Sequence, residues 1–278
     1  MTARGGTGRR GGRTGGSRAG EGPVLLVDVG NTNTVFGVWR DGGLVEVFRL
    51  STDAERTADE HGALLLPLFA RAGIDPADAE AVVVSSVVPP LHPTLERLSR
   101  TYFGREPMFV EPGIKTGLPI RYDNPSEVGA DRIVNSLAAR ERYGAPVVVV
   151  DFGTATTFDI VNEAGEYAGG IIAPGITISA EALFARASRL RRVEIRKPAQ
   201  LVGRDTAGAM ESGFYYGYIG LVDGILERLS AEVPGLTTVV ATGGLAPLIA
   251  SGSRFIREVD PLITLAGLKL IHERNRRG

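Results

Sequence analysis

Two stretches of the chain repeat one pattern of apolar and polar positions. Residues 24–39 read VLLVDVGNTNTVFGVW, and residues 147–162 read VVVVDFGTATTFDIVN. In each stretch an apolar, β-prone run ends in Asp-x-Gly, small hydroxyl or amide residues follow, and a second β-prone run begins. Glycine permits a tight polar turn, so the pattern predicts a buried strand, a turn and a returning strand in both places.

Each predicted hairpin continues into a similar series of elements. Short polar turns lead into a third strand at 44–50 in the first case and at 167–173 in the second. The segments that follow favour helices and strands at 57–72, 81–86 and 89–103, and again at 176–188, 204–230 and 237–241. Two α/β halves with matching openings predict a duplicated domain.

The duplication predicts two domains and leaves the N-terminus outside them. We expect the boundary near 144–146, between an N-terminal domain of residues 22–145 and a C-terminal domain of residues 146–278. Residues 1–21 are rich in Gly and Arg and have no apolar period, so we expect a disordered tail whose deletion changes neither melting temperature nor kcat. Because no apolar stretch follows the arginines, a signal peptide is not expected, and we predict a cytoplasmic protein.

Composition narrows the chemistry. The chain has 278 residues and three lysines. It has no cysteine, which excludes thiolate catalysis. Its three histidines are far apart in the sequence, which argues against a histidine-rich metal site. Without the five arginines of its first 20 residues, the net charge of −1 becomes −6, which is poorly suited to binding nucleic acid. No apolar run approaches the roughly 20 residues that span a bilayer, so no membrane contact is expected.

The two hairpins carry groups that suit a polyphosphate. Glycine turns expose backbone N–H groups, and the segment from Asn31 to Thr34 adds side-chain donors. Asp28 and Asp151 cannot bind phosphate directly, but carboxylates at these positions can hold a cation that bridges phosphate oxygens. One Asp-Gly strand end is ordinarily only a turn, whereas two equivalent copies favour a ligand site between two domains.

These residues resemble the actin, sugar kinase and Hsp70-like superfamily, an α/β actin/hexokinase-like ATPase fold with two ribonuclease-H-like domains from a duplication and a nucleotide cleft between them. The segment YDNPSEVGADRIVN at 122–135 is similar to the pantothenate-binding segment of type III pantothenate kinases. Six motifs occur in that family's order over about residues 24–270: VDVGNTNT, GADR, DFGTATT, GGIIAPGI, GRDTAGAMESG and ATGG.

The resemblance implies a role for each matching residue. Asp131 corresponds to the proton acceptor for the pantothenate hydroxyl, and Asp151 to the ligand of a monovalent cation, K⁺ or NH₄⁺. The positions that correspond to ATP contacts, with Mg²⁺ accompanying the nucleotide, are Asp28, Val29, Gly30, Asn31, Thr32, Asn33, Thr34, Val35 and Thr154, with Gly243 and Gly244 beside adenosine. The positions that correspond to pantothenate contacts are Tyr122, Gly129, Ala130, Asp131, Arg132 and Thr206. The family also implies a homodimer whose pantothenate site draws on both subunits.

Each of these residues also has an ordinary structural interpretation, which the sequence leaves open. Asp131 fits the first turn of a helix, where a carboxylate stabilises the dipole, and Arg132 fits a solvated helix charge. Tyr122 fits a half-buried loop aromatic, and Thr206 fits an N-cap. Asp151 fits a second magnesium ligand, as in related kinases.

The resemblance implies ATP-dependent phosphorylation of pantothenate to 4'-phosphopantothenate, the first committed step toward coenzyme A. Two alternatives stay open. One is another kinase of the same superfamily, acting on a different small hydroxylated substrate. The other is a regulatory or accessory protein that binds nucleotide without turnover. Such a descendant is expected to have lost Asp131 or a residue of the phosphate loop, and this chain retains them.

Overall fold

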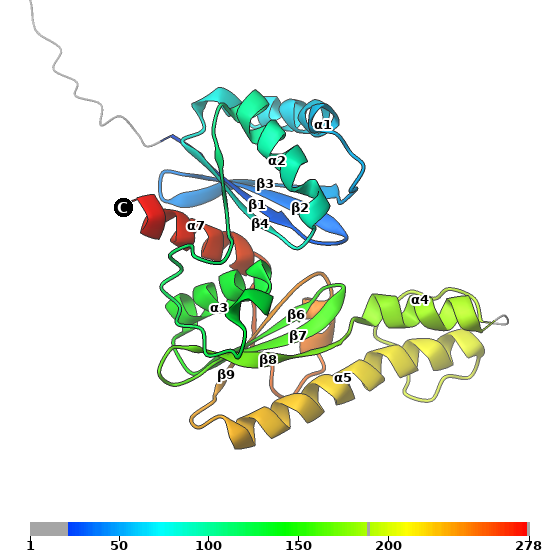
Figure 1. The fold of residues 1–278 in the computed structure, drawn as a ribbon. Helices are drawn as coiled ribbons and strands as arrows, with labels where there is room; N and C mark the ends of the chain where they lie inside the picture. Colours follow the sequence, from blue (N-terminus) through cyan, green and yellow to red (C-terminus); the bar gives the residue numbers. More distant parts are fainter. Residues whose placement is uncertain (1–21, 188–189, 277–278) are drawn as a thin grey trace, which may run out of the picture.

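Two five-stranded sheets with the same topology organise the chain (Figure 1). The computed structural model describes residues 22–187 and 190–276, so the predicted tail of residues 1–21 lies outside the described residues. The first sheet has the order β3-β2-β1-β4-β5, formed by Val24–Val29 (β1), Asn33–Arg40 (β2), Gly43–Ser51 (β3), Ala81–Ser86 (β4) and Pro107–Phe109 (β5). The second has the order β10-β9-β6-β7-β8, formed by Val147–Phe152 (β6), Ala155–Val161 (β7), Tyr167–Pro174 (β8), Thr238–Thr242 (β9) and Glu258–Val259 (β10).

The repeated hairpins predicted from the sequence are confirmed. In each sheet three antiparallel strands come first, and two strands parallel to the first one follow. The helices are Ala58–Arg71 (α1), His92–Leu98 (α2), Ala130–Tyr143 (α3), Ile176–Arg186 (α4), Thr206–Glu232 (α5), Ala246–Ala250 (α6) and Ile263–Arg276 (α7). A capping box between Thr57 and Glu60 begins α1, which satisfies two backbone donors that the helix cannot bond internally.

The expected helix at 89–103 is wrong as a single element. Prolines at 89 and 90 open a 3₁₀ turn, α2 follows over His92–Leu98, and a wider π turn over Ser99–Phe103 ends at Gly104. Gly104 has φ = 62°, a left-handed conformation that stops the helix and that glycine adopts without strain. The broad apolar periodicity of this region therefore hides three short turns.

Each sheet is covered on both faces: an inner face, which is turned toward the other sheet, and an outer face, which is turned away from it. On β1 the alternating residues Leu25, Val27 and Val29 pack on the side of α1 and α2, while Val24 and Leu26 pack on the side of α3 and α7. The second sheet packs its outer face against α5 and α6, and residues Val147 and Val149 of its inner face against α3. Consequently α3 and α7 lie between the two sheets and contact both.

Helix α7 comes from the C-terminal end of the chain but packs against β1 and β4 of the first sheet. The domain boundary near 144–146 stays a prediction. Helices α4 and α5 pack on each other and extend away from the second sheet as an arm, with the start of α5 near its outer end (Figure 1). No helix in the described part of the chain combines the length and hydrophobicity needed to cross a bilayer.

Candidate active site

Three aspartates from separate elements converge where the two sheets face each other. Asp28 follows Val24 and Leu26 on the inner face of β1, and Asp151 follows Val147 and Val149 at the equivalent position of β6. Asp131 lies in the first turn of α3, the helix between the sheets. The three carboxylates act on one another electrostatically, so Asp28 forms one acidic cluster with two residues more than a hundred positions later in the chain.

The cluster is short of compensating charge. The pKa of Asp28 is raised from 3.8 to about 7, first by burial and then by the charges of Asp131 and Asp151, against a lowering by Arg49. Burial and the charge of Asp131 also raise the pKa of Asp151 to about 7, against a hydrogen bond from Asn135. Carboxylates in this state are stabilised by a cation, and their oxygens are the ligands that hard cations prefer.

These raised pKa values predict a pH-dependent stability. Between pH 3.8 and about 7 the folded protein binds more protons at Asp28 and Asp151 than the unfolded chain does, so stability falls as pH rises through this window. The free energy of unfolding should fall by at most about 1.4 kcal/mol per pH unit for each of the two carboxyl groups. We expect urea denaturation of the ligand-free protein to show this loss relative to the double variant Asp28→Asn/Asp151→Asn. Parallel pH profiles of the two proteins would contradict it.

The turns of the two hairpins lie close to each other. In each turn the glycine N–H donates to a backbone carbonyl 3.0 Å away, from Gly30 to Asn33 and from Gly153 to Ala155. The hydroxyls of Thr32 and Thr154 lie 3.4 Å apart, and both residues are exposed. The two predicted phosphate loops therefore present their tips to one space.

The eight residues predicted for the first loop differ in accessibility. Asn31, Thr32 and Asn33 are exposed, whereas Val29 and Thr34 are buried and Val35 is half-buried. The hydroxyl of Thr34 is hydrogen-bonded to that of Thr52 at 2.9 Å. The side chain of Thr34 thus supports the loop from inside and is not exposed on its surface.

The carboxylate of Asp131 is both an acid in the first turn of a helix and a residue of the site, the two interpretations that the sequence left open. Its Oδ1 accepts a hydrogen bond of 2.8 Å from the backbone N–H of Arg132, as expected for an acid in the first turn of a helix. The same carboxylate belongs to the acidic cluster, and burial raises its pKa. At the preceding N-cap, Gly129, a Cβ atom would stand 2.6 Å from Oδ1, so this glycine leaves room for the carboxylate.

Arg132 is a buried charge, which contradicts its interpretation as a solvated helix residue. Its Nε donates to Oδ1 of Asp159 at 2.7 Å, and Asp159 also accepts hydrogen bonds of 3.0 Å from the hydroxyls of Tyr167 and Thr157. Nη2 of Arg132 is buried without a hydrogen-bond partner. A Cβ atom at Gly170 would fall 2.3 Å from Nη2, so the glycine of β8 gives this nitrogen its space.

The other residues predicted to bind the substrate divide into two groups. Tyr122 is exposed, rather than half-buried as a loop aromatic, and its ring lies 6.2 Å from that of Tyr167, beside the Arg132–Asp159 pair. Gly129 and Ala130 open α3 next to Asp131. These residues therefore gather around the start of α3.

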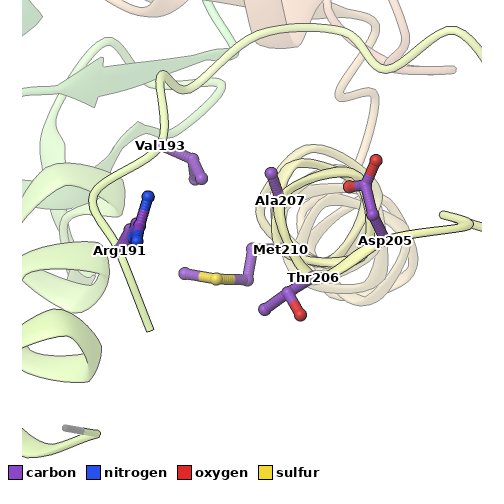
Figure 2. Close-up of a pocket in the computed structure, with 6 residues that line it drawn as sticks. All are labelled: Arg191, Val193, Asp205, Thr206, Ala207 and Met210. Atoms are coloured by element: carbon purple, nitrogen blue, oxygen red, sulfur yellow. The ribbon is translucent and has the colours of Figure 1, made fainter. Parts of the chain in front are cut away.

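Thr206 lies elsewhere. The N-cap of α5 is Asp205, whose Oδ1 accepts a 2.7 Å hydrogen bond from the N–H of Gly208, so the interpretation of Thr206 as the N-cap is wrong by one residue. Thr206 lines a pocket of about 350 Å³ together with Arg191, Val193, Asp205, Ala207 and Met210. Figure 2 shows how these side chains lie. This pocket is at the start of α5, near the outer end of the arm, whereas Asp131 is on α3 between the sheets (Figure 1). One subunit does not bring Thr206 to Asp131.

Several residues of the site were missed by the sequence analysis. Asn135 donates to Asp151 at 3.4 Å and accepts from Thr264 at 2.7 Å; its spacing of four from Asp131 on a predicted helix was an available signal. Asp159 is a second missed residue, and its signal was an acidic side chain inside a β-prone run. Arg49 is aligned with Asp28 through the strand pairing, on the same inner face, and sequence spacing gave no sign of this.

Gly243, predicted to lie in a turn beside adenosine, approaches the acidic cluster closely. It has φ = +90°, a conformation that favours glycine, and a Cβ atom there would stand 2.7 Å from Oδ1 of Asp151 and 2.6 Å from the carbonyl oxygen of Phe152. The turn after β9 therefore packs directly on the end of β6. Among the described residues no three His, Asp or Glu side chains converge closely enough to hold a metal ion by themselves.

Comparison with known proteins identifies the fold and the family. A solved structure of a candidate 2-dehydro-3-deoxygalactonokinase from Sinorhizobium meliloti has a TM-score of 0.59 at 14% identity, covering 90% of this chain and 96% of that one. A candidate Baf family transcriptional activator from Campylobacter jejuni has a TM-score of 0.56 at 21% identity, covering 91% of this chain and 100% of that one. With the repeated sheets, these likenesses show the actin/hexokinase-like ATPase fold, and at such identity they show the fold alone.

The sequence relatives are much more similar. A type III pantothenate kinase from Koribacter versatilis (strain Ellin345) is 55% identical over 263 residues, which cover 91% of this chain and 96% of the relative. The family model described as "Type III pantothenate kinase" matches residues 24–228, which include both hairpins and the whole acidic cluster. On this evidence the chain belongs to the type III pantothenate kinase family.

Proposed function

We propose that this protein transfers the γ-phosphoryl group of ATP to pantothenate, giving 4'-phosphopantothenate for coenzyme A biosynthesis. The observation that carries the proposal is the convergence of Asp131 with the ends of both hairpins in a member of this family. The direct test is an assay of ADP release with and without pantothenate, in the presence of Mg²⁺ and K⁺. ADP release that does not depend on pantothenate would reject the proposal.

The two hairpin turns are the proposed phosphate site. The hydroxyls of Thr32 and Thr154 would supply neutral donors from two sides of one space, on turns that the N–H groups of Gly30 and Gly153 hold by internal hydrogen bonds. Phosphoryl transfer passes through a loose transition state in most analyses, so catalysis is mainly positioning and charge stabilisation. Turns that meet at their tips suit this requirement.

Asp131 is the proposed proton acceptor for the pantothenate hydroxyl. In a loose transition state the hydroxyl proton leaves late, so an aspartate is a sufficient base. Burial raises the pKa of Asp131, which brings it closer to the working pH and makes it a better acceptor once it is ionised. Its bond to the N–H of Arg132 fixes one carboxylate oxygen in place.

Arg132 is the proposed partner of the pantothenate carboxylate. Its guanidinium is held on one side by Asp159, and the buried Nη2 without a hydrogen-bond partner is a donor that a carboxylate would satisfy. The exposed ring of Tyr122 lies near the same pair and offers an apolar surface to the carbon skeleton of the substrate.

Mg²⁺ with the ATP phosphates and a monovalent cation at Asp151 are the proposed ions. They would supply countercharge to the nucleotide and to a carboxylate cluster whose pKa values are raised by burial. Because no three acidic or histidine side chains of the described residues lie close enough to bind one metal ion together, further ligands would come from phosphate oxygens, water or backbone carbonyls.

The monovalent ion predicts a specific activation. With saturating Mg²⁺ and sodium as the monovalent ion, added K⁺ is expected to raise kcat severalfold in the wild type and to have little effect in Asp151→Ala. The physical reason is that Asp151 lies beside Asp131 and Asp159 and needs its own countercharge. K⁺ is also expected to raise the melting temperature of the wild type but not of the variant. If Asp151 is instead a second magnesium ligand, sodium alone will sustain the full rate.

A homodimer is the proposed assembly. On α5, Gly213, Gly217 and Gly220 follow a spacing of four and three, and a Cβ atom at each would meet nothing within 4 Å. Large apolar side chains are exposed on α4, on α5, in the loop before α5 and on β8: Ile171, Ile172, Ile178, Leu183, Leu201, Val202 and Tyr216. Tyr215, in contrast, is buried in its own subunit. An exposed apolar surface of this kind is typical of protein interfaces, and a second subunit would supply the distant Thr206.

Gly217→Arg is therefore expected to give a monomer by light scattering. The side chain has room within the subunit, so the fold should persist, while close packing of a second α5 is blocked. Pantothenate turnover should fall strongly while ATP binding persists, because the proposed site needs the partner subunit's Thr206. The control is Ser230→Arg, an exposed position farther along the same helix. A wild-type protein that is active as a monomer at assay concentration would contradict the dimer.

A further inference from the structure

The turn of the first hairpin is held by a residue outside it. Thr52 follows β3, and its backbone N–H donates to the carbonyl of Thr32 at 2.9 Å. Its hydroxyl donates to the carbonyl of Gly30 at 2.7 Å and lies 2.9 Å from the hydroxyl of Thr34. A hydroxyl carries one proton, so Thr34 is the donor in the last bond. Thr52 thus contacts three alternate residues of the proposed phosphate loop.

Few other contacts maintain this turn. One backbone hydrogen bond within it runs from the N–H of Gly30 to the carbonyl of Asn33. Thr34 is buried and Thr52 is half-buried, so loss of the Thr52 hydroxyl would leave the Gly30 carbonyl and the Thr34 hydroxyl without this partner in a partly desolvated place. An unmade hydrogen bond in such a place is costly, and the backbone would shift to recover it.

In the second hairpin, the position equivalent to Thr52 supports the turn in a different way. Asn33 pairs with Ser51 just before Thr52, and Ala155 pairs with Pro174 just before Gly175, so Thr52 and Gly175 are equivalent in the two sheets. A Cβ atom at Gly175 would lie 2.1 Å from the carbonyl oxygen of Thr154. The second turn is therefore supported by direct backbone packing, whereas the first is supported through a side-chain hydroxyl.

The segment that carries Thr52 is itself well anchored. Nη1 of Arg56 donates to the carbonyl of Ser51 at 2.9 Å, and its backbone N–H donates to the carbonyl of Asp53. The capping box of Thr57 and Glu60 then joins the segment to α1. Thr52 therefore connects the turn to a segment that is itself fixed in place. A functional group is held precisely only when the residues that support it are fixed in this way.

We propose that Thr52 is a positioning residue for phosphoryl transfer: its hydroxyl and N–H hold the turn from Gly30 to Thr34 in the conformation that presents backbone N–H groups and Thr32 to the ATP phosphates. Thr52 acts through the turn and does not touch the nucleotide. The inference rests on the proposed ATP site. It assigns a role to a residue that the sequence motifs do not include.

The test compares Thr52→Val, which removes the hydroxyl at nearly constant shape, with Thr52→Ser, which keeps it. Thr101→Val, at an exposed position of the turn after α2, is the matched control. We expect Thr52→Val to lose about 10- to 100-fold in kcat/KM for ATP, as small misplacements of positioned groups do, with the KM for pantothenate little changed. Thr52→Ser should stay within about threefold of the wild type.

Two further measurements separate this role from simple destabilisation. Binding of a fluorescent ATP analogue to the folded fraction should weaken in Thr52→Val and recover in Thr52→Ser. Thr52→Ala is measured in parallel, because alanine fits any site that holds threonine. Unchanged ATP affinity and kcat in a folded valine or alanine variant would overturn the proposal. If the wild type instead binds the ATP analogue but shows no pantothenate-dependent ADP release, the proposed function fails, while the binding comparison still tests Thr52.

Discussion

Asp131→Asn is expected to lower kcat by about 10²–10⁴-fold, the usual range for loss of a general base. The amide keeps the size of the side chain and still accepts the hydrogen bond from the N–H of Arg132, but it cannot take up the hydroxyl proton. ATP binding should be retained or tightened, because the substitution removes one negative charge that acts on Asp28 and Asp151. Steady-state kinetics with a separate nucleotide-binding titration measure both effects.

The matched control is Asp78→Asn, an exposed aspartate in a 3₁₀ turn far along the chain from the cluster, which should leave both quantities unchanged. An Asp131→Asn enzyme with wild-type kcat would remove Asp131 from the mechanism. A variant with lost ATP affinity but normal kcat at saturation would assign Asp131 to nucleotide binding instead.

Arg132→Met is expected to destabilise the fold by about 3–5 kcal/mol, the range found when one partner of a buried ion pair is removed. Asp159 is buried and its Oδ1 lies 2.7 Å from Nε of Arg132, so the variant leaves a carboxylate without its countercharge. Pantothenate affinity should fall as well, since Nη2 is the proposed donor to the substrate carboxylate. Urea denaturation and isothermal titration with pantothenate measure the two losses.

A second ion pair in the chain provides the control. Arg121 pairs with Glu166 at 3.0 Å, but the arginine side chain is 71% exposed, and exposed pairs contribute about 0–1 kcal/mol. Arg121→Met should therefore change stability little. In Arg132→Met, burial without the arginine raises the pKa of Asp159, so the stability deficit should shrink as pH falls and Asp159 takes up a proton. A deficit that is independent of pH would show that packing, not charge, is responsible.

The two hairpins could be located from the sequence because their determinants are local. A buried apolar strand, an Asp-x-Gly turn and a returning strand each depend on neighbouring residues, and β1–β2 and β6–β7 appear where the pattern placed them. The helix predicted at 89–103 failed for the complementary reason. Apolar spacing does not distinguish one helix from consecutive 3₁₀, α and π turns.

The site could be predicted only in part. The motif residues Asp28, Asp131 and Asp151 do come together, but the motifs do not show which residues contact and support them. Thr52 is joined to the first turn through the end of β3, and Asn135 to Asp151 across two elements. Such contacts follow from strand register and helix packing, which involve residues distant in the chain.

The sequence by itself determined the two hairpins, the duplication and the family, because strand and turn preferences are local and the motifs occur in a recognisable order. The tertiary structure decided the electrostatics. Whether Arg132 is solvated or buried against Asp159, and whether the pKa of Asp28 is ordinary or raised to about 7, depends on desolvation by everything packed around the group. It also decided that Thr206 is remote from Asp131 within one subunit, because the direction in which α4 and α5 extend is set by their packing on each other and on the second sheet.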